Sequence, residues 1–372
     1  MNLLIRGYYN LFKAGFCSSK WSLASRSYML PFNRDAPLKS YLFNAYPTGI
    51  ITAEHFLDGP ALTYHINLFF PDAKLSRSGK NQASHFRFFP GLSIEDYSKL
   101  GYYSNKPWTA EEMNAISPNE FISELIEKIE NGIYIHAQVN DFFIPKTSSF
   151  RKKHRRHEVL LVGYDHKIRT FKQVSYTTDR VLEIVDLPIG LLVESLKIGK
   201  YRLKELPSVI EEISLESDRP KHMDTDCVSA QLLSYLHADR GSSWFSKASK
   251  FTSGNPLTDS RGTFGIGVYS SFRKCFRAFG NERGLIDLRA TRTLMEHKWV
   301  IYRVFDRIAV NSQCRALANE YKNVLDLARR LQQMSFAVVG DQGRSNFGLL
   351  IKLLDEIEDK ERRIMTHWLK AF

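Results

Sequence analysis

The sequence predicts an α+β domain followed by a bundle of long helices. The α+β prediction depends on residues 117–176, where a helix is followed by three strands, with a basic loop and a hairpin turn between them. The bundle is predicted from residues 263–372, where apolar residues recur at helical spacing and short polar breaks separate the segments. With 372 residues, 43% hydrophobic and 25% charged, the chain is long enough for two domains.

The helix of the α+β domain is expected from Pro118 to Glu130. Ser117 is a good N-cap, Pro118 stands at the first helical position, and Glu120 completes a capping box. Gly132 supplies the stop signal after the last turn. The apolar residues of this segment fall at helical spacing and form one stripe: Phe121, Ile122, Leu125, Ile126 and Ile129.

Three strands are expected after this helix. Residues 133–139 alternate between apolar and polar side chains, which is the period of a strand. Residues 158–165 form an apolar run typical of a central strand that is buried on both faces. A hairpin turn at residues 165–167 then leads to a third strand at residues 170–176.

The rest of the chain divides into a linker and a helical domain. Residues 201–262 are rich in Pro, Ser, Asp and Gly, and we expect a linker with peripheral segments there. From residue 263 onward, three or four long amphipathic helices are expected. On one of them Glu296, which stands beside His297 and Lys298, is expected to pair with a residue one helical turn away.

Three segments resemble the butirosin-biosynthesis-H-like family, relatives of papain-type cysteine peptidases in natural-product gene clusters. Residues 134–165 (YIHAQVNDFFIP…RKKHRRHEVLLVGYD) are similar to the second half of the catalytic core in bacteriocin-processing and butirosin-H-like proteins. Residues 29–37 (MLPFNRDAP) resemble the start of the family. FGIGVYSSF and IDLRATRTLMEHKWVIYRV, within residues 264–304, resemble its helical region. The resemblance implies a papain-like domain at residues 29–200 and a helical domain at residues 263–372.

Acyl transfer is the chemistry that this resemblance implies. In such a site a cysteine thiolate at a helix N-terminus attacks a thioester or amide, a histidine accepts its proton, and an Asp or Asn orients the histidine. His157 stands at the histidine position and Ser175 at the orienting position. The nucleophile is expected near residues 40–45, where Ser40 stands and no cysteine does, and Pro47 should interrupt a helix that starts there.

Two functions are compatible with this pattern. In the first, Ser40 and His157 act in an acyltransferase or thioesterase-like enzyme of nonribosomal peptide or polyketide biosynthesis. Its donor would be a carrier-protein thioester, its acceptor a small-molecule amine or a peptide, and it would need no cofactor. In the second, the chain is a catalytically inactive peptidase-like binding or scaffold module for an assembly-line protein. Ser40 would then be a helix N-cap, and His157 a strand residue that hydrogen-bonds a neighbour.

A dense cationic run directly precedes the histidine. Five of the seven residues from 151 to 157 carry a permanent positive charge: Arg151, Lys152, Lys153, Arg155 and Arg156. The run is either a solvated loop or an anion-docking site for an acidic carrier protein or its phosphopantetheine phosphate. We favour protein or phosphate over nucleic acid, because no nucleic-acid-binding motif accompanies the run. The net charge of +12 agrees with an acidic partner.

Several classes of site and location are not expected. His154 and His157 form an HxxH pair that His136 could approach, but the surrounding cations oppose a metal ion. No segment approaches the ~20 apolar residues that cross a membrane. The four cysteines stand far apart without a CxxC pair, so we expect a reducing, cytoplasmic location. The apolar stripes of the helical domain would also allow a homodimer.

The first residues of the chain are unusually basic. Residues 1–34 contain five Lys or Arg residues and no acidic residue. This composition is typical of an organelle transit peptide. The alternative is that residues 1–28 are a basic N-terminal extension, because the family resemblance begins at Met29.

Overall fold

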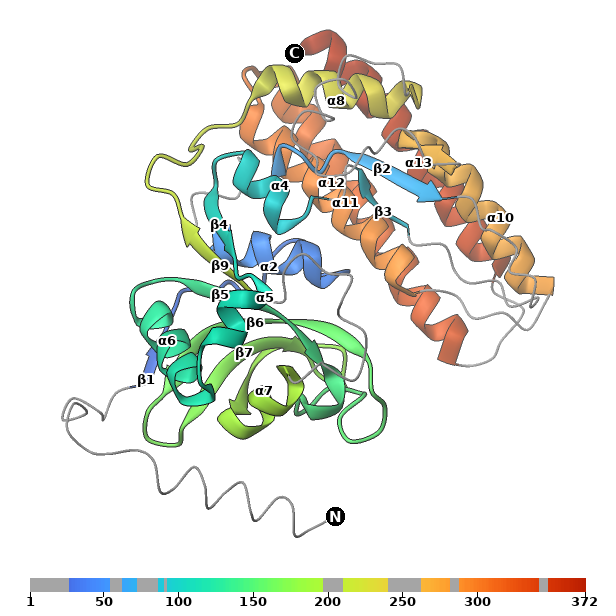
Figure 1. Cartoon of the computed structure of the whole chain (residues 1–372). Helices are drawn as coiled ribbons and strands as arrows, with labels where there is room; N and C mark the ends of the chain where they lie inside the picture. Colours follow the sequence, from blue (N-terminus) through green and yellow to red (C-terminus); the bar gives the residue numbers. More distant parts are fainter. Residues whose placement is uncertain are drawn as a thin grey trace.

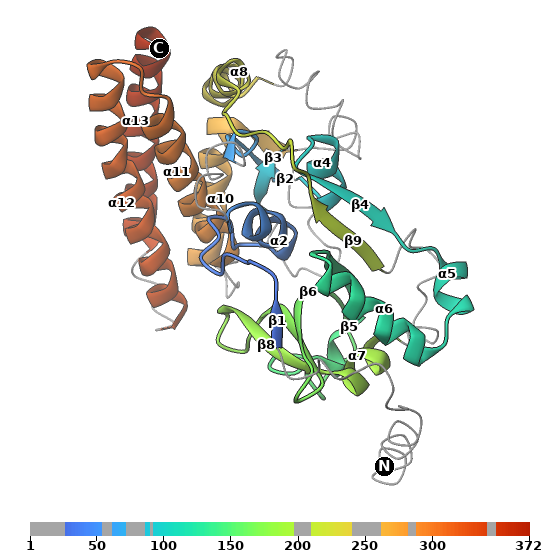
Figure 2. The ribbon, with the colours of Figure 1, turned by 90° about the vertical axis from the view of Figure 1, so that its left-hand side faces the viewer.

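The computed structural model of the chain combines a large sheet with a helical unit (Figures 1 and 2). It describes residues 27–53, 62–71, 86–89, 92–196, 210–239, 262–281, 288–340 and 347–372. Within these residues both helices and sheets are extensive, which confirms the α+β class. The basic extension at residues 1–28 lies almost wholly outside the described residues.

The large sheet has seven strands, and every pairing between them is antiparallel. Its strands follow the order β4 (Tyr103–Pro107), β9 (Ile210–Leu215), β5 (Tyr134–Asn140), β6 (Arg156–Asp165), β7 (Thr170–Tyr176) and β8 (Leu182–Pro188), while β1 (Ser27–Met29) pairs with the far end of β6. The three strands that the sequence predicts are therefore confirmed as β5, β6 and β7. They form the centre of the sheet.

The predicted helix is also confirmed, as α6 (Pro118–Glu130). The Ser117 side chain accepts a hydrogen bond from the Glu120 N–H, and the Glu120 carboxylate accepts one from the Ser117 N–H. This reciprocal capping box pairs two polar groups that a helix end leaves open. The apolar stripe of α6 is buried against the sheet.

The described part of residues 201–262 contains two elements where the composition predicts a linker with peripheral segments. Ile210–Leu215 form β9, which is inserted between β4 and β5 and buries Ile210 and Ile213. Residues Thr225–His237 form helix α8, capped by the Asp224 side chain. The few apolar residues of β9 are enough for a strand because both of its edges are hydrogen-bonded to neighbouring strands, which the average composition does not show.

A second sheet of three strands belongs to the helical unit. Its order is β10 (Gly262–Phe264), β2 (Asn67–Pro71) and β3 (Arg87–Phe89). Phe70 and Phe86 pack edge to face against Phe272 of the helical unit. Segments between residues 62 and 89 therefore contribute to the helical core, although the sequence assigns them to the first domain.

Long helices form the C-terminal part of the chain, as predicted. They are α10 (Val268–Asn281), α11 (Leu288–Ile308), α12 (Ser312–Gly340) and α13 (Phe347–Ala371). Figure 1 shows them beside one another, with α8 across one end. The described part of the chain contains no helix with the length and apolar character needed to cross a membrane.

Helix α2 (Leu42–Ile51) lies between the large sheet and the helical unit in both views (Figures 1 and 2). The hydroxyl of Tyr46 donates to the carbonyls of Glu158 on β6 and Val174 on β7, at 3.1 and 3.0 Å. Pro47 lies inside this helix, so the expectation that it interrupts one is wrong. Nine of the ten residues of α2 are buried, and this packing offsets the backbone hydrogen bond that proline removes.

The remaining helices described in the first unit are short: α4 (Ile94–Lys99), α5 (Ala110–Ala115), α7 (Ile189–Leu196) and the 3₁₀ turn η2 (Asp141–Phe143).

Candidate functional site

Ser40 lies one residue before the N-cap of α2 and is bound to a carboxylate from the helical unit. Its Oγ donates to Oε2 of Glu296 on α11 at 2.5 Å. The backbone N–H groups of Lys39 and Ser40 donate to the same carboxylate, at 2.9 and 3.1 Å. Glu296 therefore binds three donors at the start of α2, where the family resemblance places the nucleophile.

Glu296 is buried, and its surroundings act on its charge in opposite directions. Burial raises the pKa of this carboxyl group, whereas the guanidinium of Arg292 and the hydrogen bonds from Ser40 and Lys39 lower it. The net pKa lies above the usual value of a glutamate. Arg292 donates to Glu296 at 3.0 Å from one helical turn away, which confirms the expected pair.

Ser40 does not serve as the N-cap that the sequence analysis considered. The N-cap of α2 is Tyr41, and no side chain caps this helix end. The start of α2 is instead held by Glu296 and by Tyr176, whose hydroxyl donates to the Lys39 carbonyl. A carboxylate at this end of a helix is also favoured by the helix dipole.

His157 and Ser175 lie on neighbouring strands but are not hydrogen-bonded to Ser40. His157 is the second residue of β6, with its Nδ1 at 3.1 Å from the Glu158 carbonyl and 3.8 Å from Oδ1 of Asp141. Ser175 is buried on β7, and its Oγ lies 3.5 Å from the Tyr176 carbonyl. Among the described residues no hydrogen bond joins Ser40, His157 and Ser175, so they do not form a connected triad.

A second histidine, which the sequence analysis considered only as a metal ligand, carries a buried charge. His136 on β5 places Nδ1 at 3.1 Å from Glu211 of β9 and Nε2 at 3.8 Å from Glu158 of β6. Burial alone would lower the pKa of His136, but the two carboxylates outweigh it and raise this pKa to about 9. His136 is therefore an imidazolium at neutral pH.

Polar contacts continue from His136 along the same face of the sheet. Gln138 donates to Glu158 at 3.3 Å and accepts from Nε of Arg156 at 3.2 Å. The ring of Tyr46 stands edge-on to His136, with 6.0 Å between the centroids. A row of paired polar groups thus extends under α2 from the buried histidine to the basic loop.

The basic loop, defined as residues 151–156, is anchored by one of its own cations. Arg155 donates to Oδ2 of the buried Asp141 at 2.8 Å. The imidazole of His154 stacks on Phe142, with 4.1 Å between the ring centroids. The other cations of the loop are exposed and, within the described part of the chain, form no ion pair: Arg151, Lys152, Lys153 and Arg156.

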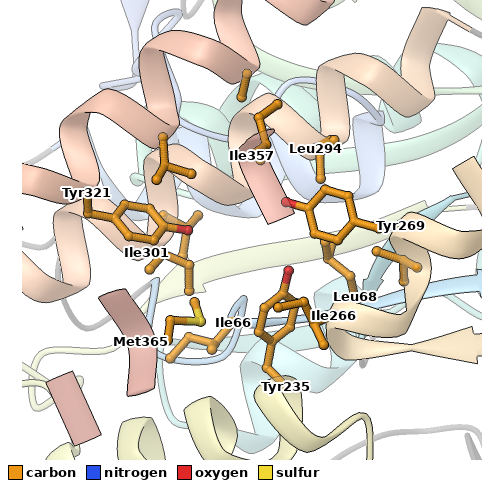
Figure 3. Close-up of a cluster of buried hydrophobic side chains, with 14 of the residues drawn as sticks. Ile66, Leu68, Tyr235, Ile266, Tyr269, Leu294, Ile301, Tyr321, Ile357 and Met365 are labelled. Carbon is orange, nitrogen blue, oxygen red and sulfur yellow. The ribbon is translucent and has the colours of Figure 1, made fainter. Parts of the chain in front are cut away.

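The residues next to Glu296 hold a buried polar cluster in the helical unit. Nζ of Lys298 lies 2.7 Å from both oxygens of Glu361 on α13, and neither side chain is exposed. The hydroxyls of three tyrosines donate to Glu361. These are Tyr235, Tyr269 and Tyr321, from α8, α10 and α12. Figure 3 shows these tyrosines among the apolar side chains of the core.

His297 connects this cluster to the small sheet. Its Nε2 donates to the Ile66 carbonyl at 2.6 Å, which leaves Nδ1 to accept from Lys298 at 3.0 Å. Burial and the neighbouring Lys298 hold the pKa of His297 well below its usual value, so the ring is neutral. Three consecutive residues of α11 therefore contact three parts of the fold. Glu296 binds the first unit, His297 binds the residue before the small sheet, and Lys298 binds the core of the helical unit.

The comparisons with known proteins add no assignment to this geometry. No protein-family model matches the sequence, and no curated protein matches it significantly. Within the described residues, no group of His, Cys, Asp and Glu side chains has the arrangement needed to hold a metal ion. The contacts of Ser40, Glu296 and the basic loop are therefore the features that bear on function.

Proposed function

We propose that the chain is a non-catalytic, peptidase-like binding module of nonribosomal peptide or polyketide biosynthesis, which docks an acidic carrier protein through the basic loop. The contact between Ser40 and Glu296 supports the non-catalytic part. A serine nucleophile needs a base that accepts its proton and free N–H donors that stabilise the oxyanion. At this site the hydroxyl of Ser40 and the neighbouring N–H groups are all bound to one buried carboxylate.

The charge of the basic loop supports the docking part. Asp141 neutralises and anchors Arg155, while Arg151, Lys152 and Lys153 are exposed in the loop and Arg156 is exposed at the start of β6. Complementary charges of this kind steer an acidic protein to its binding site and set its orientation. The loop leads into β6, so a bound carrier protein would lie beside the strand that begins with Arg156 and His157.

One observation favours a second function, an acyltransferase in which Glu296 replaces His157 as the base. The distance of 2.5 Å between Ser40 Oγ and Glu296 is that of a strong hydrogen bond to a carboxylate. Ser40 is only 6% exposed and Glu296 only 3%, so a thioester would first have to displace the contact. The binding function needs no such rearrangement.

A variant of the basic loop tests the docking. Changing Arg151, Lys152, Lys153 and Arg156 to Gln is expected to weaken binding of a phosphopantetheinylated acyl carrier protein by about tenfold or more, because each exposed charge pair contributes up to ~1 kcal/mol. Fluorescence anisotropy with a labelled carrier protein measures this affinity. Binding to the unchanged protein should also weaken as salt increases.

The matched control removes the same number of exposed cations from the helical unit. Its four changes to Gln are at Arg307, Arg315, Lys322 and Arg330. The control variant should bind the carrier protein within about twofold of the unchanged protein, since only long-range attraction is reduced. Equal affinity of the basic-loop variant and the control variant would contradict the docking function.

A further inference from the structure

Four cationic residues stand at backbone positions that usually favour glycine. In the described part of the chain, the non-glycine residues with positive φ are Lys146 (61°), Arg151 (55°), Arg169 (53°), Arg180 (60°) and Ala238 (51°). A side chain in this left-handed region costs about 1 kcal/mol or more, whereas glycine adopts the region freely. Strained backbone positions of this kind cluster at binding and active sites.

Two of these residues lie on loops that touch each other. Lys146 precedes the basic loop, and Arg180 lies in the turn between β7 and β8. The N–H of Thr178 in that turn donates to the Lys146 carbonyl at 2.8 Å. Both cations are exposed. The turn between β7 and β8 therefore adds one cation, Arg180, which stands beside the exposed Asp179, to the surface that carries the basic loop.

The backbone of these loops is already hydrogen-bonded internally. The N–H groups of Arg151 and Lys152 donate to the carbonyls of Phe142 and Ser149, at 2.9 and 3.0 Å, and the N–H of Arg180 donates to Thr177 at 2.9 Å. A phosphate site typically uses free backbone N–H groups that point at one anion. Here the positive charge comes from side chains at separate backbone positions. This arrangement matches several carboxylates spread over a protein surface better than it matches one phosphate.

Nucleic acid fits this surface less well. Single-stranded nucleic acid is bound by aromatic rings that offer a free face to the bases. Near the basic loop, one face of Phe142 is covered by the His154 ring, and Phe143 stands edge-on to Phe142 at 5.1 Å. The aromatic residues of η2 are thus used to pack the loop.

On the basis of the proposed function, we infer that Lys146 and Arg180 complete a docking surface formed by two loops. Its ligand is the carboxylate-rich face of a carrier protein. The surface joins the exposed cations of the basic loop with those of the segment before it and of the β7–β8 turn. The left-handed backbone at Lys146 and Arg180 holds these side chains at the rim of the surface at a cost in stability.

Glycine substitutions separate charge from fold at this surface. In Lys146→Gly with Arg180→Gly, relief of the left-handed strain offsets the added chain entropy of glycine, so the melting temperature should stay within a few degrees. Affinity for the carrier protein should fall by about fivefold to tenfold. Arg169→Gly is the backbone control and removes one cation rather than two. Arg169 has the same backbone geometry but lies in the β6–β7 turn, at the opposite end of β6.

The outcomes distinguish this inference from the proposed function. One outcome is that the double variant Lys146→Gly, Arg180→Gly binds the carrier protein as tightly as Arg169→Gly, while the basic-loop variant binds it more weakly. The inference of a two-loop surface is then wrong, and the docking function stands. If the basic-loop variant also binds normally, the proposed function itself fails. Carrier protein without phosphopantetheine should bind as well as the modified form. A requirement for the phosphate, or displacement of the carrier by a DNA duplex of equal charge, would overturn the assignment to a protein surface.

Discussion

Replacing Lys298 with methionine is expected to lower the free energy of unfolding by about 3–5 kcal/mol. Lys298 is fully buried, and its ammonium group lies 2.7 Å from both oxygens of Glu361. Methionine fills a similar volume but leaves the Glu361 carboxylate buried without its cation. The three tyrosine hydroxyls that donate to Glu361 keep its hydrogen bonds but supply no charge.

Urea unfolding followed by circular dichroism measures this loss. Lys360→Met is the matched control, because Lys360 stands beside Glu361 on α13 but is partly exposed and forms an ion pair with Glu356 on the surface. That substitution should cost no more than about 0.5 kcal/mol. Equal stability of the two variants would mean that Lys298 is not a charged partner of Glu361 in the folded protein.

The second large effect is a loss of stability at alkaline pH through His136. The pKa of His136 in the folded protein is about 9, because Glu158 and Glu211 outweigh the effect of burial. The unfolded value is ~6.5. Since the folded pKa is the higher one, the stabilisation is fully present below pH ~6.5 and is lost as the pH rises to about 9. The shift corresponds to about 3 kcal/mol.

Urea titrations between pH 6 and pH 9.5 test this dependence, with His136→Gln as the comparison. The variant retains a hydrogen-bonding side chain but cannot become charged, so its stability should change less over this range. Groups that titrate in both proteins cancel in the difference between the two curves. If the two curves run parallel, His136 is not a cation between its two glutamates.

Local sequence signals account for the elements that could be predicted. The capping box at Ser117 and the alternation after Gly132 identify α6 and β5 without knowledge of the rest of the chain. Strand β9 was not predicted, because its six residues form a strand only through pairing with β4 and β5. Neither partner is close to β9 in the sequence, so its surroundings suggest a linker.

The candidate site shows the same limit. The family resemblance selects Ser40, His157 and Ser175 as catalytic positions. It includes Glu296 only as part of a helical segment and gives no sign that this residue, 256 positions from Ser40, binds it. The charge of His136 likewise depends on Glu211, which reaches it only because β9 pairs with β5 in that register. Contacts across such distances have no periodic or local pattern in a single sequence.

The charged surface was predictable in part. Five cations in seven residues are visible in the sequence, whereas the burial of Asp141, which commits Arg155 to an internal ion pair, is not. Nor does the sequence show that Lys146 and Arg180 adopt positive φ on loops that touch. The contact between the loops depends on the β7–β8 turn, whose Thr178 N–H donates to the Lys146 carbonyl.

Intact-mass spectrometry of the protein after incubation with acyl-carrier thioesters tests the non-catalytic account most directly. We expect no covalent acyl adduct and no thioester turnover beyond that of a Ser40→Ala variant, because the Ser40 hydroxyl and the N–H groups beside it stay bound to Glu296. His157→Ala and Glu296→Gln should behave in the same way. An acyl adduct on the unchanged protein that is lost in Ser40→Ala would contradict the account. Its loss in Glu296→Gln or in His157→Ala would then identify the base.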